Sequence, residues 1–483
     1  MVARRELPLF NRLLYASGSL GGNVLSRTKD LWLIFFYAPP GDADIGERVP
    51  ILLVGGILTA TRVIEALDDP LIGWWSDRTR SRWGRRIPFV VLATPFYAVL
   101  FVLIWLPPDD SETARNAIYF FTILWAFHLF STLSGGPFES LLPEIAPTSR
   151  ERVSIVTWQV FFGTIGAFIA LVISGIIIDF AGFQAMALTM AVLALGSRYL
   201  GLAGAWRYTR RDVEPATVGA WEAFRATLRN DQFLYYLPTF ILFNMAISMM
   251  TASLPFWSSA VLFQGFPDEI AQVEAGRVAT LHLFGLDVSL GAGAIVGLMT
   301  GAAIGVVLLS LPLVYRLALT RGKAWVYSTA MLAGALYLPF VAFMGFVPGL
   351  NQFSQALLFV AGIGLPMAAV FTFPNAIQAD IIDYDEARTG FRREAVYYGS
   401  QATMEKIAFS LFPLVLAGLL LLGSSAENPL GIRLVGPVAG FISLLGYLTF
   451  RGYRLPDTVT PETLRAAGFK LPERGPSDTE PAT

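Results

Sequence analysis

The chain has 483 residues, of which 54% are hydrophobic and 15% are charged, and its formal net charge is −1. Soluble domains typically carry about 25% charged residues, so this composition favours an integral membrane protein and gives no sign of a nucleic-acid partner. Cysteine is absent, which excludes disulfide bonds and thiolate metal sites.

Twelve apolar segments are long enough to cross a bilayer, for which roughly 20 apolar residues are needed. We therefore predict an all-α membrane protein with twelve transmembrane helices in two six-helix bundles. The first residues, "MVARRELPLFNRLL", lack an uninterrupted apolar region and a small-residue cleavage site, so we expect no cleaved signal peptide. In chain order the segments are 12–38, 50–75, 87–106, 115–142, 153–178, 183–207, 233–262, 289–316, 324–345, 351–378, 396–422 and 430–451.

The loops between these segments alternate in charge. Basic loops such as "SDRTRSRWGRR", "RYTRRD" and "RTGFRRE" alternate with acidic or neutral ones such as "PPGDADIGE", "PPDDSE" and "SSAEN". Loops rich in Arg and Lys stay on the cytoplasmic side of a membrane. We therefore predict that both termini are cytoplasmic, in a multi-pass protein of the cell (inner) membrane.

A long basic loop divides the predicted helices six and six. Within it, Trp221, Phe224 and Leu228 fall at the spacing of a short amphipathic helix. The two halves echo each other weakly, and repeated halves with a site between them are typical of transporters. The predicted domains are an N-terminal bundle over 1–207, a cytoplasmic linker with an amphipathic helix over 208–232, a C-terminal bundle over 233–455 and a disordered cytoplasmic tail over 456–483.

The segment "RVIEALDDPLIGWW" places three carboxylates, Glu65, Asp68 and Asp69, inside the second predicted helix. A charge at the centre of a bilayer costs at least ~2.5–3.5 kcal/mol. Glu65 and Asp69 lie four residues apart on one helix face, and two close carboxylates in a low dielectric need a proton, a cation or a basic partner. Carboxylate oxygens suit a hard cation such as Na⁺. The alternative is that Arg62 and the loop arginines neutralise the group in a purely structural role.

Four predicted helices carry polar stripes at helical spacing. Such a stripe is either a seam of hydrogen bonds between helices or the wall of a water-filled cavity, and four of them favour the cavity. Lys406 is the natural counter-charge of the buried carboxylates, whereas His128 on its own is more typical of a structural histidine with satisfied hydrogen bonds. The stripes are Asn23, Ser26, Arg27 and Asp30; His128, Ser131, Thr132, Gly135 and Glu139; Asn244, Ser248 and Thr251; and Gly399, Thr403 and Lys406. To the substrate cavity we assign Asn23, Arg27, Asp30, Glu139, Asn244, Gln401 and Lys406.

Two longer motifs resemble a known family. The pattern Gly-x-x-x-Asp-Arg…Gly-Arg-Arg of the major facilitator superfamily occurs with "TRSRW" inserted in its middle, at Gly73, Asp77, Arg78, Gly84, Arg85 and Arg86. This insertion after "DDPLIGWWSD", together with "QADIIDYDEARTGFRREAVYYGSQATMEKIA" at 378–408, is similar to the glycoside–pentoside–hexuronide:cation symporter family. The resemblance spans most of the chain and implies the major facilitator fold.

The resemblance implies a cation site at Glu65, Asp68, Asp69 and Thr132, with Lys406 in the place of the family's helix-11 lysine. Glu65 stands where the family usually has Asp, so the choice between Na⁺ and H⁺ stays open. The family's sugar-binding residues are not matched, since Asn23, Gly135 and Val160 stand at those positions. A charged, zwitterionic or amphiphilic solute is therefore an alternative to a sugar. Gly73, Asp77, Arg78, Arg85 and Arg86 would form a conformational latch, or else only mark the cytoplasmic side.

We predict a cation-coupled symporter, driven by Na⁺ or H⁺, that moves a small sugar or glycoside-like solute by alternating access. Alternatives are a transporter of charged or amphiphilic solutes and an uncoupled facilitator. An enzyme is disfavoured because the chain has only two histidines and no evident catalytic set. We expect no cofactor, no metal other than a coupling Na⁺, and a protein that works as a monomer in the bilayer.

Overall fold

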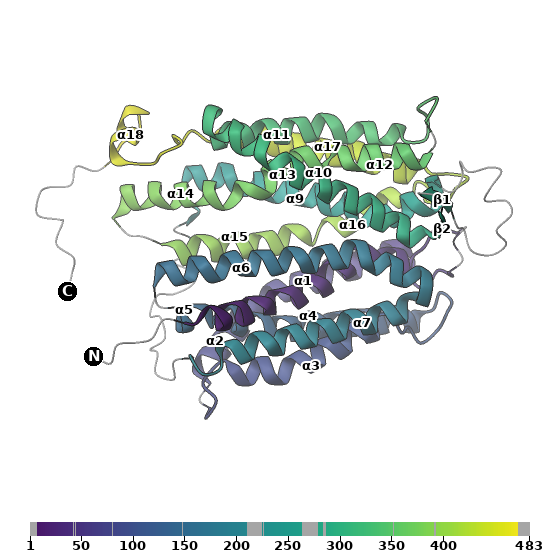
Figure 1. Ribbon diagram of the computed structural model, residues 1–483, viewed down its shortest axis with the longest axis horizontal. Helices are drawn as coiled ribbons and strands as arrows, with labels where there is room; N and C mark the ends of the chain where they lie inside the picture. The colour runs from purple at the N-terminus through teal and green to yellow at the C-terminus, as the bar shows by residue number, and fades with distance from the viewer. Residues whose placement is uncertain are drawn as a thin grey trace, which may run out of the picture.

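The computed structural model describes residues 7–41, 43, 45–79, 81–146, 148–209, 225, 227–262, 279–283, 286–350, 352–390 and 393–471, and they are almost entirely helical (Figure 1). The first part of the chain forms α1 (Leu9–Tyr37), α2 (Ile51–Arg78), α3 (Ile87–Ile104), α4 (Ala114–Glu139), α5 (Leu142–Ile145), α6 (Ser149–Phe168), the π-helical turn η1 (Ile169–Ile173) and α7 (Ser174–Ala205). The second part forms α9 (Asp231–Phe256), η2 (Trp257–Leu262), β1 (Ala279–Leu283), β2 (Leu286–Leu290), α10 (Ala292–Arg321), α11 (Lys323–Tyr337), η4 (Leu338–Phe343), α12 (Gln352–Gly362), α13 (Gly364–Thr372), α14 (Pro374–Thr389), α15 (Glu394–Phe409), α16 (Phe412–Leu420), α17 (Leu430–Phe450) and α18 (Pro461–Ala466).

The helices follow the predicted apolar segments closely. Within the described residues, eight helices are long and apolar enough to cross a membrane, and α1 and α2, which carry the polar residues singled out above, are not among them. One of the eight, Ser154–Ala205, has 52 residues, more than twice the roughly 20 that one crossing needs. Gly182 interrupts it with a φ of 80°, a value that glycine adopts at no steric cost. This long helix therefore accommodates two of the predicted segments.

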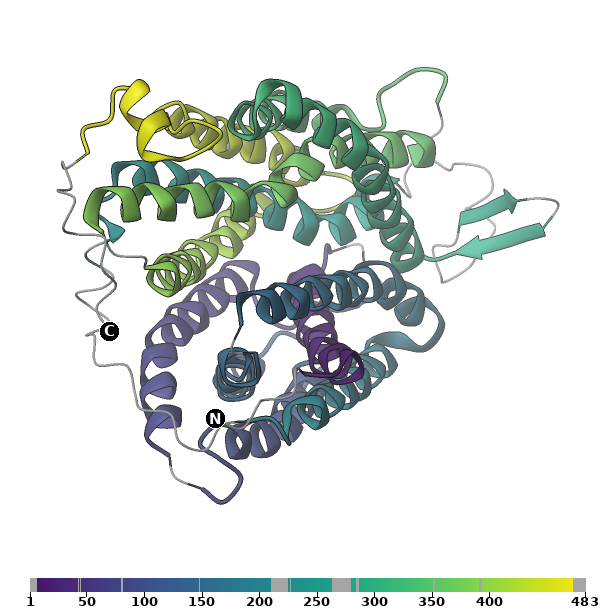
Figure 2. The ribbon, with the colours of Figure 1, turned by 60° about the vertical axis from the view of Figure 1, so that its left-hand side comes forward.

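The secondary structure differs from the prediction at two places. The all-α class is confirmed, and β1 and β2 add an antiparallel hairpin that projects from the helices (Figure 2). The predicted disordered tail is ordered as far as residue 471, since α18 buries Leu464 completely and the Phe469 ring lies 5.1 Å from that of Tyr384. Trp221 and Phe224 of the predicted amphipathic helix, and residues 472–483, lie outside the described residues.

The helices pack as two bodies. Helices α1 to α7 gather on one side and α9 to α17 on the other, as Figure 2 shows. We call the end that carries the loops 79–86 and 206–209 the basic end, and the end that carries the loops 38–50, 105–113 and 421–429 the acidic end. Across the boundary, α2 packs on α15 and α16, α1 packs on α9, and α7 and η1 pack on α10.

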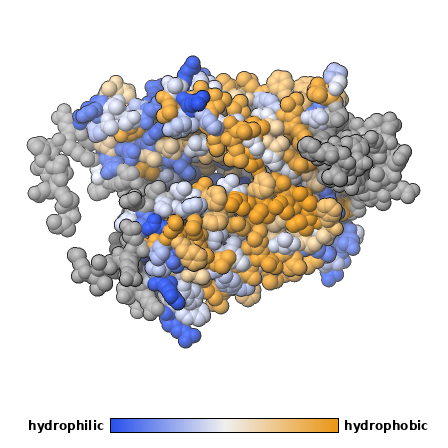
Figure 3. Space-filling model, in the orientation of Figure 1, coloured by the Kyte–Doolittle hydropathy of each residue, from blue (hydrophilic) through white to orange (hydrophobic). Residues whose placement is uncertain are grey.

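The two halves are closed against each other at the acidic end. A side chain at Gly55 would meet Ala417, with its Cβ 2.8 Å from that of the alanine, and one at Gly175 would meet the carbonyl oxygen of Gly293. The Asp179 carboxylate of α7 accepts hydrogen bonds from the backbone N–H groups of Gly293 (2.9 Å) and Ala294 (2.6 Å), at the N-terminus of α10. A helix N-terminus favours such a negative group. Nearer the middle of the face in Figure 3, a hollow separates the halves.

Candidate functional site

Glu65 lies midway along α2 and is only 6% exposed. Its Oε2 accepts a hydrogen bond from Arg62 Nη1 at 2.9 Å and lies 3.0 Å from Nδ1 of His128 on α4. Its Oε1 lies 3.2 Å from Nζ of Lys406 on α15. One buried carboxylate thus has three basic neighbours on three helices, and its pair with Lys406 joins the two halves of the molecule.

Asp30 on α1 extends this cluster. Lys29 Nζ donates a hydrogen bond to Asp30 at 2.5 Å, and Arg62 Nη2 lies 3.4 Å from the same oxygen. Arg62 therefore lies between the two carboxylates and links α1 to α2. We call Lys29, Asp30, Arg62, Glu65, His128 and Lys406 the charge cluster.

Basic side chains outnumber the carboxylates of Asp30 and Glu65 in the charge cluster. Three basic side chains, Lys29, Arg62 and Lys406, face two carboxylates. Glu405, next to Lys406, adds a third carboxyl group within electrostatic reach of Arg62 and Lys406. Ion pairs compensate buried charges that would otherwise cost several kcal/mol each. In this conformation both carboxylate oxygens of Glu65 are in contact with basic side chains of the protein.

The interpretation of His128 as a histidine with satisfied hydrogen bonds is wrong. Its Nδ1 faces Glu65, but its Nε2 is buried and has no hydrogen-bond partner among the residues that the structure describes. A buried nitrogen left without a partner costs about 1–3 kcal/mol and calls for an explanation. The sequence offered no signal for this contact, because the partner carboxylate lies on another helix.

The other predicted cation ligands are only partly described. The Asp69 side chain lies outside the described residues. Asp68 and Thr132 are half-buried, and each has an interaction partner of its own. The predicted four-residue cation site therefore stays a prediction. Glu65 is the member of that site whose contacts are described above.

The predicted cavity residues divide into three groups. Asp30 and Lys406 belong to the charge cluster. Asn23 and Asn244 donate hydrogen bonds to carbonyl oxygens one turn earlier in their own helices, and Gln401 accepts one from the Tyr236 hydroxyl at 3.2 Å.

Arg27 on α1 and Glu139 on α4 differ from these residues because both are exposed. Glu139 accepts a hydrogen bond from Gln159 of α6 at 3.1 Å. An exposed charge on a membrane helix is favoured where it meets water or a polar solute rather than lipid.

The described part of the predicted latch includes an acid, Glu144, that the sequence did not assign to it. Arg85 donates two hydrogen bonds to Glu144 Oε1, at 3.0 and 3.1 Å, and Arg86 lies 3.1 Å from the same oxygen and donates to the Ser140 carbonyl. Glu144 lies in α5, directly after α4, and is 4% exposed. Of the other predicted members, the Asp77 side chain lies outside the described residues, Arg78 is exposed with a partner of its own, and a side chain at Gly73 would meet nothing within 4 Å.

We expect Glu144→Gln to destabilise the N-terminal half strongly. The change leaves two nearly buried guanidinium groups facing one neutral amide, and removing one partner of a buried ion pair typically costs about 3–5 kcal/mol. Thermal unfolding of the purified protein in detergent measures the loss. Glu462→Gln, at an exposed position of α18, is the matched control, and equal midpoints for the two variants would contradict a structural role for Glu144.

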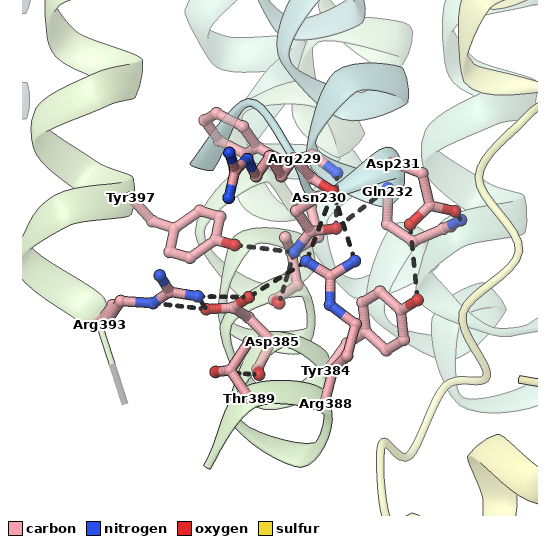
Figure 4. A network of polar contacts seen from close by, with 12 residues as sticks. Arg229, Asn230, Asp231, Gln232, Tyr384, Asp385, Arg388, Thr389, Arg393 and Tyr397 are labelled. Atoms are coloured by element: carbon pink, nitrogen blue, oxygen red, sulfur yellow. Dashed lines mark hydrogen bonds and ion pairs between the residues drawn. The ribbon is translucent and has the colours of Figure 1, made fainter. Parts of the chain in front are cut away.

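The C-terminal half has a comparable arrangement at the basic end. Arg393 binds the fully buried Asp385 through two nitrogens, at 2.7 and 2.9 Å, and Asn230 donates to the Tyr397 hydroxyl (Figure 4). Lys323, which begins α11, lies 2.7 Å from Asp380 of α14, just as Arg86, before α3, contacts Glu144 after α4. Asp385 and Arg393 both lie in the motif at 378–408, but nothing in the sequence pattern indicates that they form a pair.

Comparison with known proteins finds transporters among the relatives of this chain. A lactose permease of Lactobacillus delbrueckii subsp. bulgaricus is 26% identical over 272 residues, which cover 53% of this chain and 43% of the permease. A sodium-dependent lysophosphatidylcholine symporter of Danio rerio is 25% identical over 179 residues, 37% of this chain and 33% of the symporter. The chain therefore matches less than half the length of either relative.

Solved structures agree in fold. The crystal structure of the nucleoside transporter NupG superposes with a TM-score of 0.58 at 13% identity, covering 92% of this chain and 98% of that one. The profile of the MFS/sugar transport protein family matches residues 14–273 and 268–423. Since these matches span most of the sequence, the chain belongs to the MFS/sugar transport protein family and is a multi-pass integral membrane protein.

Proposed function

We propose that the protein is a cation-coupled symporter in which Glu65 is the coupling carboxylate. The observation that carries this proposal is the ion pair between Glu65 and Lys406, which crosses between the two halves deep in the membrane region. A carboxylate at this depth is costly unless it is compensated, so its partners change only if another cation replaces them.

The exchange of partners gives a coupling mechanism. A Na⁺ ion or a proton that binds Glu65 competes with Lys406, and the released lysine no longer holds α15 against α2. The cation thereby favours one arrangement of the halves, and the solute that binds between them favours the same one. Coupling of this kind is reciprocal, so the solute tightens cation binding by the same factor. Closure at the acidic end supports alternating access, with both termini and the basic end in the cytoplasm.

The solute is a small polar compound with many hydroxyl groups, such as a sugar or glycoside. The amide side chains of Asn23, Gln159 and Asn244 supply donors and acceptors that suit hydroxyl groups, and one relative is named a lactose permease. The exposed Arg27 and Glu139 favour a second candidate, a zwitterionic or amphiphilic solute. The relative named a lysophosphatidylcholine symporter supports that candidate.

Ligand-dependent thermal unfolding in detergent tests the coupling ion and the solute together. The protein is unfolded in Na⁺ and in choline at matched ionic strength, over a pH series, with a panel of glycosides, uronates, organic ions and lysolipids. A ligand that binds only the folded state at 100 times its Kd stabilises it by about 2.7 kcal/mol. We expect one panel compound to raise the midpoint more when the coupling cation is present.

The variants separate the outcomes. A Na⁺-dependent midpoint that disappears in Glu65→Gln but persists in the exposed control Glu112→Gln identifies a sodium site. Dependence on pH alone, lost in the same variant, identifies a proton. If neither cation changes solute binding, the charge cluster is structural and the coupling proposal is wrong.

A further inference from the structure

A pocket of about 300 Å³ lies at the basic end, away from the charge cluster. It is lined by Arg82 and Trp83 from the loop between α2 and α3, and by Trp206, Arg207 and Thr209 from the end of α7. Arg82 and Trp83 belong to "TRSRW", the insertion to which the proposed transport mechanism assigns no role. The pocket is therefore built from two separate segments that the transport site does not include.

No carboxylate in the described residues neutralises the two arginines of the pocket. Within the described part of the chain, neither Arg82 nor Arg207 forms an ion pair with a carboxylate. The nearby Arg85 and Arg86 differ, because Glu144 binds both. Two guanidinium groups beside the Thr209 hydroxyl give the pocket the donors that recognise a phosphate group.

The two tryptophans place the pocket at the surface of the bilayer. The Trp83 and Trp206 rings lie 5.9 Å apart, and the Arg82 guanidinium lies 5.6 Å from the centre of the Trp83 ring. Both indoles are more than one third exposed, and they sit where the membrane helices α3 and α7 begin and end. Tryptophan gathers at this depth, which is the level of the lipid head groups.

We propose that this pocket binds the phosphate of an anionic phospholipid, with the glycerol and the upper acyl chains against the two indoles. Its volume lies at the lower end of the range for small-ligand pockets, which suits a compact head group rather than a whole solute. Basic pockets on the cytoplasmic side of membrane proteins take anionic head groups, and each arginine near the surface adds roughly a factor of five in affinity. This inference does not depend on cation coupling.

Titration with phosphatidylglycerol tests the proposal. The lipid is added to the purified protein in neutral detergent, with phosphatidylcholine as the comparison. Thermal unfolding and native mass spectrometry then report stabilisation and bound lipid. We expect phosphatidylglycerol to stabilise the wild type, and the double variant Arg82→Gln/Arg207→Gln to lose roughly 30-fold in apparent affinity. The double variant's midpoint without lipid verifies that it is folded.

Two further arms make the result specific. Arg316→Gln removes an exposed arginine near the same end of α10, outside the pocket, and we expect it to keep full lipid affinity. If Arg316→Gln loses as much lipid affinity as the double variant, or the double variant loses none, the proposed site is wrong.

Titration with inorganic phosphate is the second control. If phosphate alone stabilises the wild type as strongly as the lipid does, the pocket is a free-anion site and the assignment to lipid is overturned.

Discussion

Glu65→Gln is expected to abolish accumulation of solute against a gradient while leaving solute exchange across the membrane intact. The amide has nearly the shape of the carboxylate, but it has no negative charge to attract a cation and takes up no proton near neutral pH. In the variant, Lys406 and His128 face a neutral group, so a cation no longer changes the contact between α2 and α15. The movement of the two halves is then no longer coupled to the cation gradient, and the solute only equilibrates across the membrane.

Uptake into proteoliposomes measures both properties, with an imposed Na⁺ or H⁺ gradient for accumulation and preloaded solute for exchange. Exchange is also the control for folding, because loss of one partner from a buried ion pair can cost about 3–5 kcal/mol. Glu65→Asp, which keeps the charge and moves it by one methylene, should retain accumulation with altered cation affinity. If Glu65→Gln still concentrates solute, Glu65 is not the coupling group.

Sequence patterns anticipated the helices better than their interruptions. Both α3 and α17 begin at the predicted residue, because Pro88 and Pro429 mark where each apolar run begins, and they end two residues and one residue before the predicted ends. The interruption at Gly182 was expected only as a short gap between two apolar runs. Order in the tail was missed because Leu464 and Phe469 are isolated apolar residues, and their burial depends on a surface formed by distant helices.

The candidate site, like the fold, could be predicted from the sequence only in part. Glu65 was identifiable because the cost of a charge inside a membrane depends only on the local sequence. The importance of Lys406 followed from the same argument. The roles of His128 and Glu144 were not accessible, since each depends on a partner from a distant segment, at Glu65 and at Arg85 respectively. Periodicity identifies the face of a helix but not the residue opposite that face.

A bulky side chain at Gly297 is expected to hold the halves apart at the acidic end. Gly297 of α10 lies so close to η1 that an added Cβ would come 2.5 Å from the Val172 carbonyl oxygen. A backbone carbonyl cannot avoid the clash by changing rotamer, as a flexible side chain can. Overpacking of this kind costs about 1–3 kcal/mol. Because that cost falls only on the conformation closed at the acidic end, Gly297→Leu should shift the population roughly 5- to 150-fold toward conformations open there.

Spin labels detect this shift, and the absence of native cysteine means that only introduced cysteines react. Phe180→Cys on α7 and Leu430→Cys at the start of α17 place two labels at exposed positions on opposite halves of the acidic end. Gly297→Leu should lengthen the distance between the labels and slow transport at least tenfold. Gly305→Leu, on the same helix but with nothing within 4 Å of its added Cβ, should leave both unchanged. If the distance stays the same in Gly297→Leu while transport falls, the glycine is needed for packing within one conformation. The contact between α10 and η1 would then not open and close during transport.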